Sequence, residues 1–150
     1  MYSTRPNLLL LVALAVTLRV NGKVIDMVVA AFGANGEALE RLPVVAASLV
    51  AVEGAGGSVE AIAEELDGKV ALIDRGQCAF TAKAKAAQDK GAVAVVIANN
   101  RPGPPAGMGT NAVGETITIA VLGVSQADGA DLRCMAGAVV GVCNGAVLGK

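Results

Sequence analysis

The sequence predicts a mixed α/β (α+β) domain organised around one central strand–helix–strand unit. Two short, nearly continuous apolar runs, residues 69–73 and 92–98, are typical of strands that are buried on both faces. The alanine-rich stretch between them, from about residue 79 to Lys90, has high helix propensity, and Gly91 stands where a helix commonly ends. Because the three elements fall within about 30 residues, we expect a parallel, right-handed βαβ crossover.

The expected helix has one buried stripe. Phe80, Ala84 and Ala87 recur at helical spacing, whereas Lys83 and the other lysines of the helix are expected mostly away from this stripe. Because the stripe consists mainly of alanine, the helix can approach a sheet closely.

Residues 1–20 form an apolar N-terminal segment, and residues 21–150 are expected to fold as a single domain. The apolar run at residues 8–16 follows Arg5 and contains a small-x-small sequence that ends at Ala15, which is the outline of a secretory signal. The run is too short to span a bilayer, which takes about 20 residues.

A hairpin is the other interpretation of the same region. Asn21-Gly22 is a strong signal for a type I′ turn, because both central residues of that turn need positive φ. Residues 16–20 then form the first strand, and Val20 pairs with Lys23. Both interpretations can hold if the chain is cleaved before this strand.

The remaining elements are expected from periodicity, capping and turn residues. In chain order they are a strand over residues 43–53, a glycine loop at 54–57, a short helix over 58–66 with Ser58 as N-cap, a proline-rich surface loop at 99–111, a strand over 116–124, and a helix that follows Ser125 and ends at Gly137. A second hairpin is expected around Asn144-Gly145, and the two hairpins can pair with one another.

Composition excludes most catalytic and nucleic-acid-binding classes. The chain has no histidine and no tryptophan, and its only aromatic residues are Tyr2, Phe32 and Phe80. Ser-His-Asp and Cys-His catalytic arrangements cannot be built without histidine, and three cysteines cannot supply a four-thiolate zinc site. The net charge of −1 gives no electrostatic surface for nucleic acid. Hydrophobic residues make up 54% of the chain, which is too apolar for disorder.

The candidate binding residues follow the two strands of the βαβ unit. Residues 74–78 leave the first strand and enter the helix, a position where ligands are common in open α/β sheets and where a helix N-terminus attracts anions. Arg75 is the expected anchor for an anion or a carboxylate, and a purely structural turn is the competing interpretation. Residues 99–101 follow the second strand and are expected close to this loop. The candidates are Arg75, Gly76, Gln77, Asn99, Asn100 and Arg101.

Neither the cysteines nor the acidic residues predict a catalytic or metal site. Cys78 lies near the expected helix N-terminus but has no histidine base, so a catalytic thiol is not expected. Cys134 and Cys143 are candidates for a disulfide between the last helix and the final hairpin, and three free buried thiols are the alternative. The acidic run at residues 60–67 is expected to be a solvated surface, so we expect no metal and no cofactor.

Several blocks of the sequence resemble the protease-associated (PA) domain family. They are GKVALIDRGQCAF at residues 68–80, Lys83, AQDKGAVAVVIANN at 87–100, and the later segments 117–119 and 124–129. The resemblance covers about residues 32–132. The chain departs from the family at Ala120, where proline is usual, so the register of that strand is open. Residues 54–67 also hold no cysteine that could pair with Cys78.

The resemblance implies a non-catalytic domain with a β-sandwich-like or partly open barrel core and short flanking helices. Such domains occur in secreted subtilases and metallopeptidases, and are thought to bind peptide segments, gate substrate access or mediate assembly. The expected partner is therefore a peptide or protein segment, with a peptidase as one candidate, in the extracellular space or the secretory pathway. No nucleic acid partner and no membrane span are expected. The alternatives are a regulatory fragment of a secreted subtilase or metallopeptidase, and a stable scaffold that binds no ligand.

Overall fold

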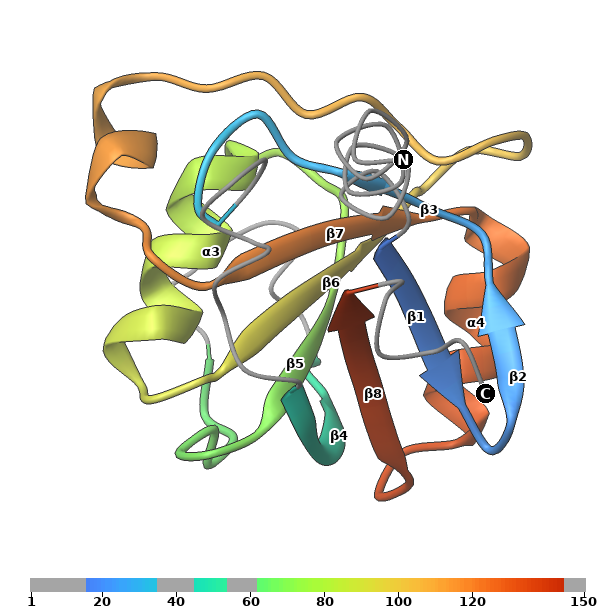
Figure 1. The fold of residues 1–150 in the computed structure, drawn as a ribbon. Coiled ribbons are helices and arrows are strands. Elements are labelled where there is room, and N and C mark those ends of the chain that lie inside the picture. Colours follow the sequence, from blue (N-terminus) through green and yellow to red (C-terminus); the bar gives the residue numbers. More distant parts are fainter. Residues whose placement is uncertain (1–15, 35–44, 54–61, 145–150) are drawn as a thin grey trace, which may run out of the picture.

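The computed structural model describes residues 16–34, 45–53 and 62–144, which form eight strands and three helices (Figure 1). The strands are β1 (Val16–Val20), β2 (Lys23–Ile25), β3 (Met27–Val29), β4 (Val45–Ala51), β5 (Val70–Asp74), β6 (Ala94–Ala98), β7 (Ala120–Val124) and β8 (Val139–Asn144). The helices are α3 (Phe80–Asp89), the 3-10 helix η2 (Ala112–Thr116) and α4 (Gln126–Cys134).

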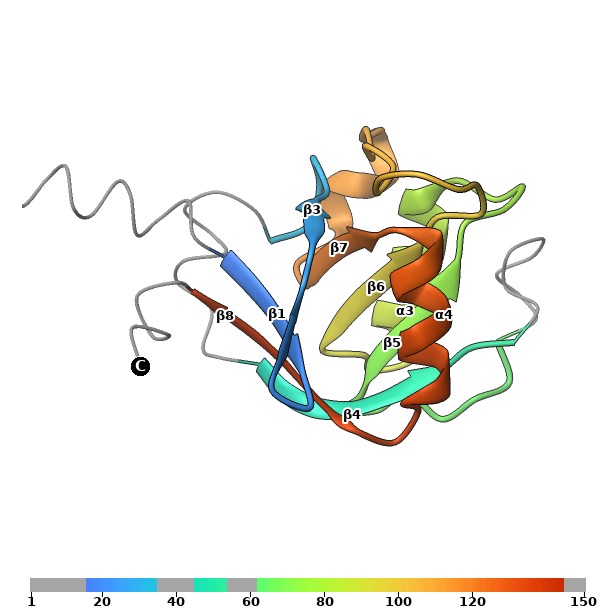
Figure 2. The ribbon, with the colours of Figure 1, turned by 90° about the vertical axis from the view of Figure 1, so that its right-hand side faces the viewer.

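The strands form one sheet that curls into a nearly closed barrel (Figures 1 and 2). Their order is β2-β1-β8-β4-β5-β6-β7-β3, in which β4 to β7 are parallel and the other pairs are antiparallel. The two edge strands, β2 and β3, are separated in the chain by Asp26 alone. Because nearly consecutive residues occupy opposite edges, the sheet has to bend until those edges approach each other. The predicted mixed α/β class with an open barrel is therefore confirmed.

The pleat of the strands sends alternate side chains into two separate cores. Leu18, Leu49 and Leu72 are at most 1% exposed and pack together inside the barrel. Ala84 and Ala87 of α3 belong to a second core, where they pack with residues on the outer face of β5, β6 and β7. Full burial of each leucine stabilises the fold by about 1.5–3 kcal/mol. The sheet therefore has a filled interior and a helix-covered outer face.

Two local predictions are confirmed by the backbone. β5 and β6 pair in parallel and α3 connects them, as the βαβ pattern indicated. At the first hairpin, Asn21 has φ 51°, Gly22 has φ 79°, and Val20 pairs with Lys23. β1 also pairs along its length with β8, so strands from the two Asn-Gly segments do lie side by side.

The short helix predicted over residues 58–66 is wrong for residues 62–66, which have no helical structure. Lys90 gives the reason. Its Nζ donates to the carbonyl oxygen of Ile62 at 2.7 Å and to that of Glu64 at 3.3 Å. Because an ammonium from the end of α3 satisfies these carbonyl groups, the segment does not need helical hydrogen bonds.

The strand predicted over residues 116–124 is shorter in the structure, where β7 begins only at Ala120. The side-chain amide of Gln88 bonds to the segment that precedes it. Its Oε1 accepts from the backbone N–H of Thr118 at 2.7 Å, and its Nε2 donates to the carbonyl oxygen of Thr116 at 3.0 Å. One side chain of α3 thus replaces the ladder bonds that a longer strand would have supplied.

Some expectations fall on residues 1–15 and 145–150, outside the described part of the chain. The secretory signal and the second turn at Asn144-Gly145 with its last strand therefore stay predictions. None of the helices in the described ranges is long and apolar enough to cross a membrane.

Candidate functional site

The carboxyl ends of β5 and β6 lie side by side at one edge of the barrel. The two strands pair as far as Asp74 and Ala98, and the backbone N–H of Arg75 then donates to the carbonyl oxygen of Ala98 at 2.8 Å. The backbone N–H of Asn99 donates in turn to the carbonyl oxygen of Val124 at 3.0 Å. These backbone bonds place the loops that follow β5 and β6 next to each other.

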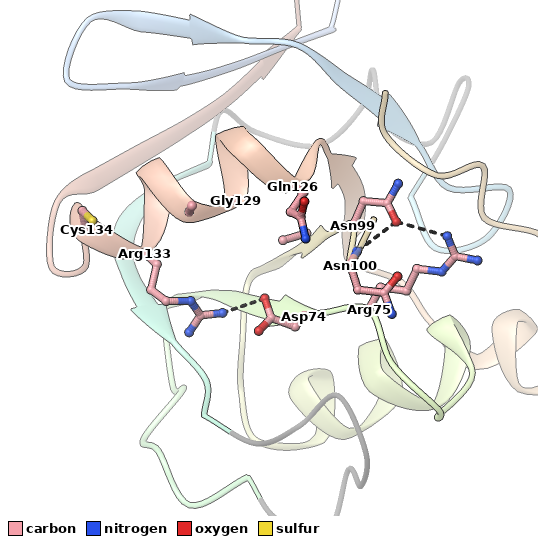
Figure 3. Close-up of a pocket in the computed structure, with 10 residues that line it drawn as sticks. Asp74, Arg75, Asn99, Asn100, Gln126, Gly129, Arg133 and Cys134 are labelled. Carbon is pink, nitrogen blue, oxygen red and sulfur yellow. Dashed lines mark hydrogen bonds and ion pairs between the residues drawn. The ribbon is translucent and has the colours of Figure 1, made fainter. Parts of the chain in front are cut away.

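The strand ends and α4 enclose an open groove with a volume of about 780 Å³ (Figure 3). Its lining residues are Asp74, Arg75, Ala98, Asn99, Asn100, Gln126, Gly129, Ala130, Arg133 and Cys134. In Figure 3, α4 runs along one wall, and Asp74, Arg75 and Asn99 lie on the other. Ligand-binding clefts commonly have volumes of about 300–1,000 Å³, so the groove is large enough for a short peptide segment.

The N-cap residue and one residue of α4 determine the position of this wall. Ser125, which precedes the predicted helix, caps it: its Oγ accepts from the backbone N–H of Asp128 at 3.1 Å. One turn later, a Cβ at Gly129 would lie 2.4 Å from the Cβ of Ala98. Carbon atoms in contact are about 3.5–4.0 Å apart, so only glycine allows α4 to lie this close to the end of β6.

Arg75 has no carboxylate partner in the described ranges of the chain. Its Nη1 donates to Oδ1 of Asn99 at 3.1 Å, and its Cζ lies 5.6 Å from the centroid of the Phe80 ring. The second contact is within cation–π range. Both contacts hold the guanidinium in place without neutralising its charge. Its remaining N–H donors suit it to a carboxylate.

Arg133 lies at the opposite end of the groove from Arg75 (Figure 3). Its Nη2 donates to Oδ1 of Asp74 at 2.7 Å, and its Nη1 to Oε1 of Glu53 at 3.5 Å. Asp74 is 55% and Glu53 81% exposed at the side chain, so each ion pair contributes only about 0–1 kcal/mol. The guanidinium matters more for geometry, because it joins α4 to the ends of β4 and β5.

Lys83 of α3 is completely buried, so the expectation that it lies away from the buried stripe is wrong. It follows Phe80 by three residues and precedes Ala87 by four, which places it on their face of the helix. Loss of water around its ammonium lowers its pKa below the ordinary value of 10.5, while the nearby Cys78 and Asp74 act in the opposite direction.

The structure brings together three of the candidate binding residues. Arg75, Asn99 and Asn100 line the groove, whereas Gly76, Gln77 and Arg101 do not. Gln77 and Arg101 are exposed to solvent outside it.

Sequence reasoning missed the residues that α4 contributes, chiefly Gln126 and Arg133. The cap at Ser125 predicts the helix itself. Nothing in the local pattern says that the helix returns across the ends of β5 and β6, and that return is what makes a groove.

Cys134 is an exposed free thiol beside the groove, and Cys78 is half-buried. The side chain of Cys143 lies outside the described residues. The Cys134–Cys143 disulfide therefore stays a prediction. In the described ranges, no group of three or more Cys, Asp or Glu side chains is placed to hold a metal ion.

Comparison with known proteins matches this chain to one domain family and to several peptidases. The PA domain family matches residues 42–132. Leucine aminopeptidase 2 of Trichophyton equinum is 32% identical over 114 residues, which cover 71% of this chain and 23% of that protein. BSAP, a zinc aminopeptidase from Bacillus subtilis, has a TM-score of 0.69 at 28% identity, covering 85% of this chain and 29% of that one.

The psychrophilic subtilisin-like protease Apa1 of Pseudoalteromonas sp. AS-11 shares the fold alone. Its TM-score is 0.63 at 17% identity, covering 85% of this chain and 32% of the protease. The chain therefore spans between 23% and 32% of the lengths of these three proteins.

Proposed function

Because the chain belongs to the PA domain family, we propose that it is a non-catalytic module that binds extended peptide segments. The observation that supports this most directly is the groove between α4 and the ends of β5 and β6, with the guanidinium of Arg75 at its edge. In this proposal a carboxylate of the peptide binds the guanidinium of Arg75, because no carboxylate in the described chain forms an ion pair with it.

The other lining groups suit a peptide main chain. Asn100 and Gln126 carry amides that can both donate and accept hydrogen bonds, as backbone N–H and C=O groups require. Ala130 is exposed on α4 and has a short side chain, so an extended segment can approach that wall without a steric conflict. The groove thus combines one charged anchor with adaptable polar contacts.

The chemistry of the chain supports binding rather than catalysis. It contains no histidine to serve as a general base. Arg133 already bonds to Asp74 in the groove, so the carboxylate there is engaged in an ion pair. Peptide recognition needs only the donors and acceptors that the groove presents.

A second function, gating access to a peptidase, is favoured by the comparisons. The relatives include aminopeptidases of which this chain covers less than a third. In such a protein the groove would hold a long substrate beside the catalytic unit. Substitution of the residue equivalent to Arg75 in BSAP should then raise KM for long peptides and leave KM for dipeptides unchanged; an equal change for both would contradict gating.

Export is also part of the proposal. It is based on the apolar run at residues 8–16, which follows Arg5 in the pattern of a secretory signal. N-terminal sequencing of the protein from its native source tests this point, because removal of the first 15 or so residues indicates export.

Fluorescence anisotropy with a labelled, mixed-sequence heptapeptide library tests the binding function. We expect Arg75→Gln to weaken binding roughly 10- to 100-fold, since hydrogen bonds to a charged group contribute about 1.5–3 kcal/mol. Lys85→Gln removes the same charge from α3, outside the groove, and should bind as the unaltered chain does. Equal affinity of the Arg75 variant, or no binding by any protein, would contradict the proposal.

A further inference from the structure

The side chain of Asn99 connects the groove to the proline-rich loop. Its Oδ1 accepts hydrogen bonds from Nη1 of Arg75 at 3.1 Å and from the backbone N–H of Asn100 at 2.9 Å (Figure 3). Its Nδ2 donates to the carbonyl oxygen of Pro104 at 3.0 Å. One amide group therefore bonds both to the charged anchor of the groove and to the far side of the loop.

The tip of the loop, residues 100–104, depends on this amide. All five residues of the tip are exposed. In the described chain, the bonds to the Asn99 side chain are the only hydrogen bonds between residues 100–105 and other residues. Further along the loop, the next hydrogen bond to another part of the chain is made by the carbonyl oxygen of Met108, which accepts from the backbone N–H of Ala31 at 3.0 Å. The prolines of the loop have no N–H, so the tip has few other bonds to offer.

We propose that Asn99 couples occupation of the groove to release of the loop tip. The inference rests on the proposed peptide-binding function and names its ligand chemistry, a carboxylate from a peptide side chain or from a peptide C-terminus. A carboxylate forms charge-assisted hydrogen bonds with a guanidinium that are about twice as strong as neutral ones. A carboxylate that binds Nη1 and Nη2 of Arg75 together competes with Oδ1 of Asn99 for Nη1 and displaces it.

The planar geometry of the amide carries this change to the loop. Oδ1 and Nδ2 of Asn99 are fixed in one plane, so a rotation that moves the oxygen away from Arg75 also moves the nitrogen. The bond from Nδ2 to Pro104 is lost with it, and the tip moves. A ligand shifts such an equilibrium because it binds one of the two arrangements better than the other.

Amide NMR of the full 150-residue chain, titrated with acetyl-Ala-Ala-Glu, tests the coupling. The backbone amides of Asn100, Arg101 and Gly103 report on the tip. We expect their shifts to saturate together with the side-chain N–H signals of Arg75. In Asn99→Ala, the backbone order parameter of Gly103 should fall to about 0.6 or below before any peptide is added, because the tip has lost the bonds that hold it, and the peptide should shift Arg75 but not the tip.

Asn100→Ala is the matched comparison for the peptide-free protein. The side chain of Asn100 makes no hydrogen bond to other described residues, so the order parameter of Gly103 should stay as in the unaltered chain. Versions of the peptide with a C-terminal amide, or with glutamine in place of glutamate, show which carboxylate binds.

Two results overturn the coupling while leaving peptide binding intact. One is a saturating shift at Arg75 without any shift at Gly103, and the other is an equal order parameter of Gly103 in Asn99→Ala and Asn100→Ala. A titration that leaves Arg75 unshifted overturns both the coupling and the proposed function.

Discussion

Gly129→Ala tests whether the close approach of α4 to β6 determines the shape of the groove. The new Cβ would lie 2.4 Å from the Cβ of Ala98 and 3.5 Å from its Cα. Ordinary carbon contacts are about 3.5–4.0 Å, so α4 has to move about 1 Å away from the end of the strand. Both residues line the groove, and the same displacement therefore changes its width.

Two opposing contributions decide the change in the free energy of unfolding. Overpacking at a close contact costs about 1–3 kcal/mol. Alanine is favoured over glycine in the interior of a helix by about 0.8–1.0 kcal/mol. We therefore expect Gly129→Ala to lower the free energy of unfolding by about 1 kcal/mol, which lowers the Tm of a domain of this size by about 2–4 °C.

Urea unfolding followed by circular dichroism measures this loss. Ala130 is the next residue of α4 and is exposed, so Ala130→Gly measures helix propensity alone. It should lower the free energy of unfolding by about 1 kcal/mol. Combining Gly129→Ala with Ala98→Gly removes the conflicting methyl group and should recover much of the loss as a coupling energy of about 0.5–3 kcal/mol. If Gly129→Ala instead stabilises the protein by about 1 kcal/mol, the helix has room and the contact does not define the groove.

Three further substitutions have definite expected outcomes. Gln88→Ala removes the amide that bonds to Thr118; it should cost about 1–3 kcal/mol and speed amide exchange there, and unchanged exchange would contradict its role. Gly22→Ala places a side chain at φ 79° and should cost about 1–2 kcal/mol in urea unfolding, whereas a neutral result would mean that the hairpin turn is not strained. Because the pKa of Lys83 is lowered in the folded state, the unfolded chain binds more protons between that lowered pKa and 10.5, so stability should fall as pH falls through this window. Lys83→Met should lack this dependence, and identical pH profiles of the two proteins would contradict the lowered pKa.

Local patterns were sufficient for the elements that local physics determines. The Asn21-Gly22 turn follows from the positive φ that its type requires. Ser125 caps α4 through its own hydroxyl group, within the same turn of chain. The βαβ unit follows from two buried strands around an alanine-rich helix. None of these needs information from a distant residue.

Contacts between distant residues decided what the sequence could not predict. Residues 62–66 are held by Lys90, and the segment before β7 is held by Gln88, more than 20 positions away in each case. Arg133 reaches Asp74 across 59 positions, which builds the second end of the groove. The burial of Lys83 could have been read from helical spacing, since it shares a face with Phe80 and Ala87, but a lysine at such a position is unusual.

The most direct test of the central claim is an amide NMR titration of the whole chain with a mixed-sequence peptide library. We expect shifts that cluster on Arg75, Asn99 and Asn100 and on the face of α4 that carries Gln126, which would locate a peptide-binding surface at the groove. A spectrum that stays unchanged, or shifts confined to surfaces away from these residues, would contradict the claim that the groove binds peptides.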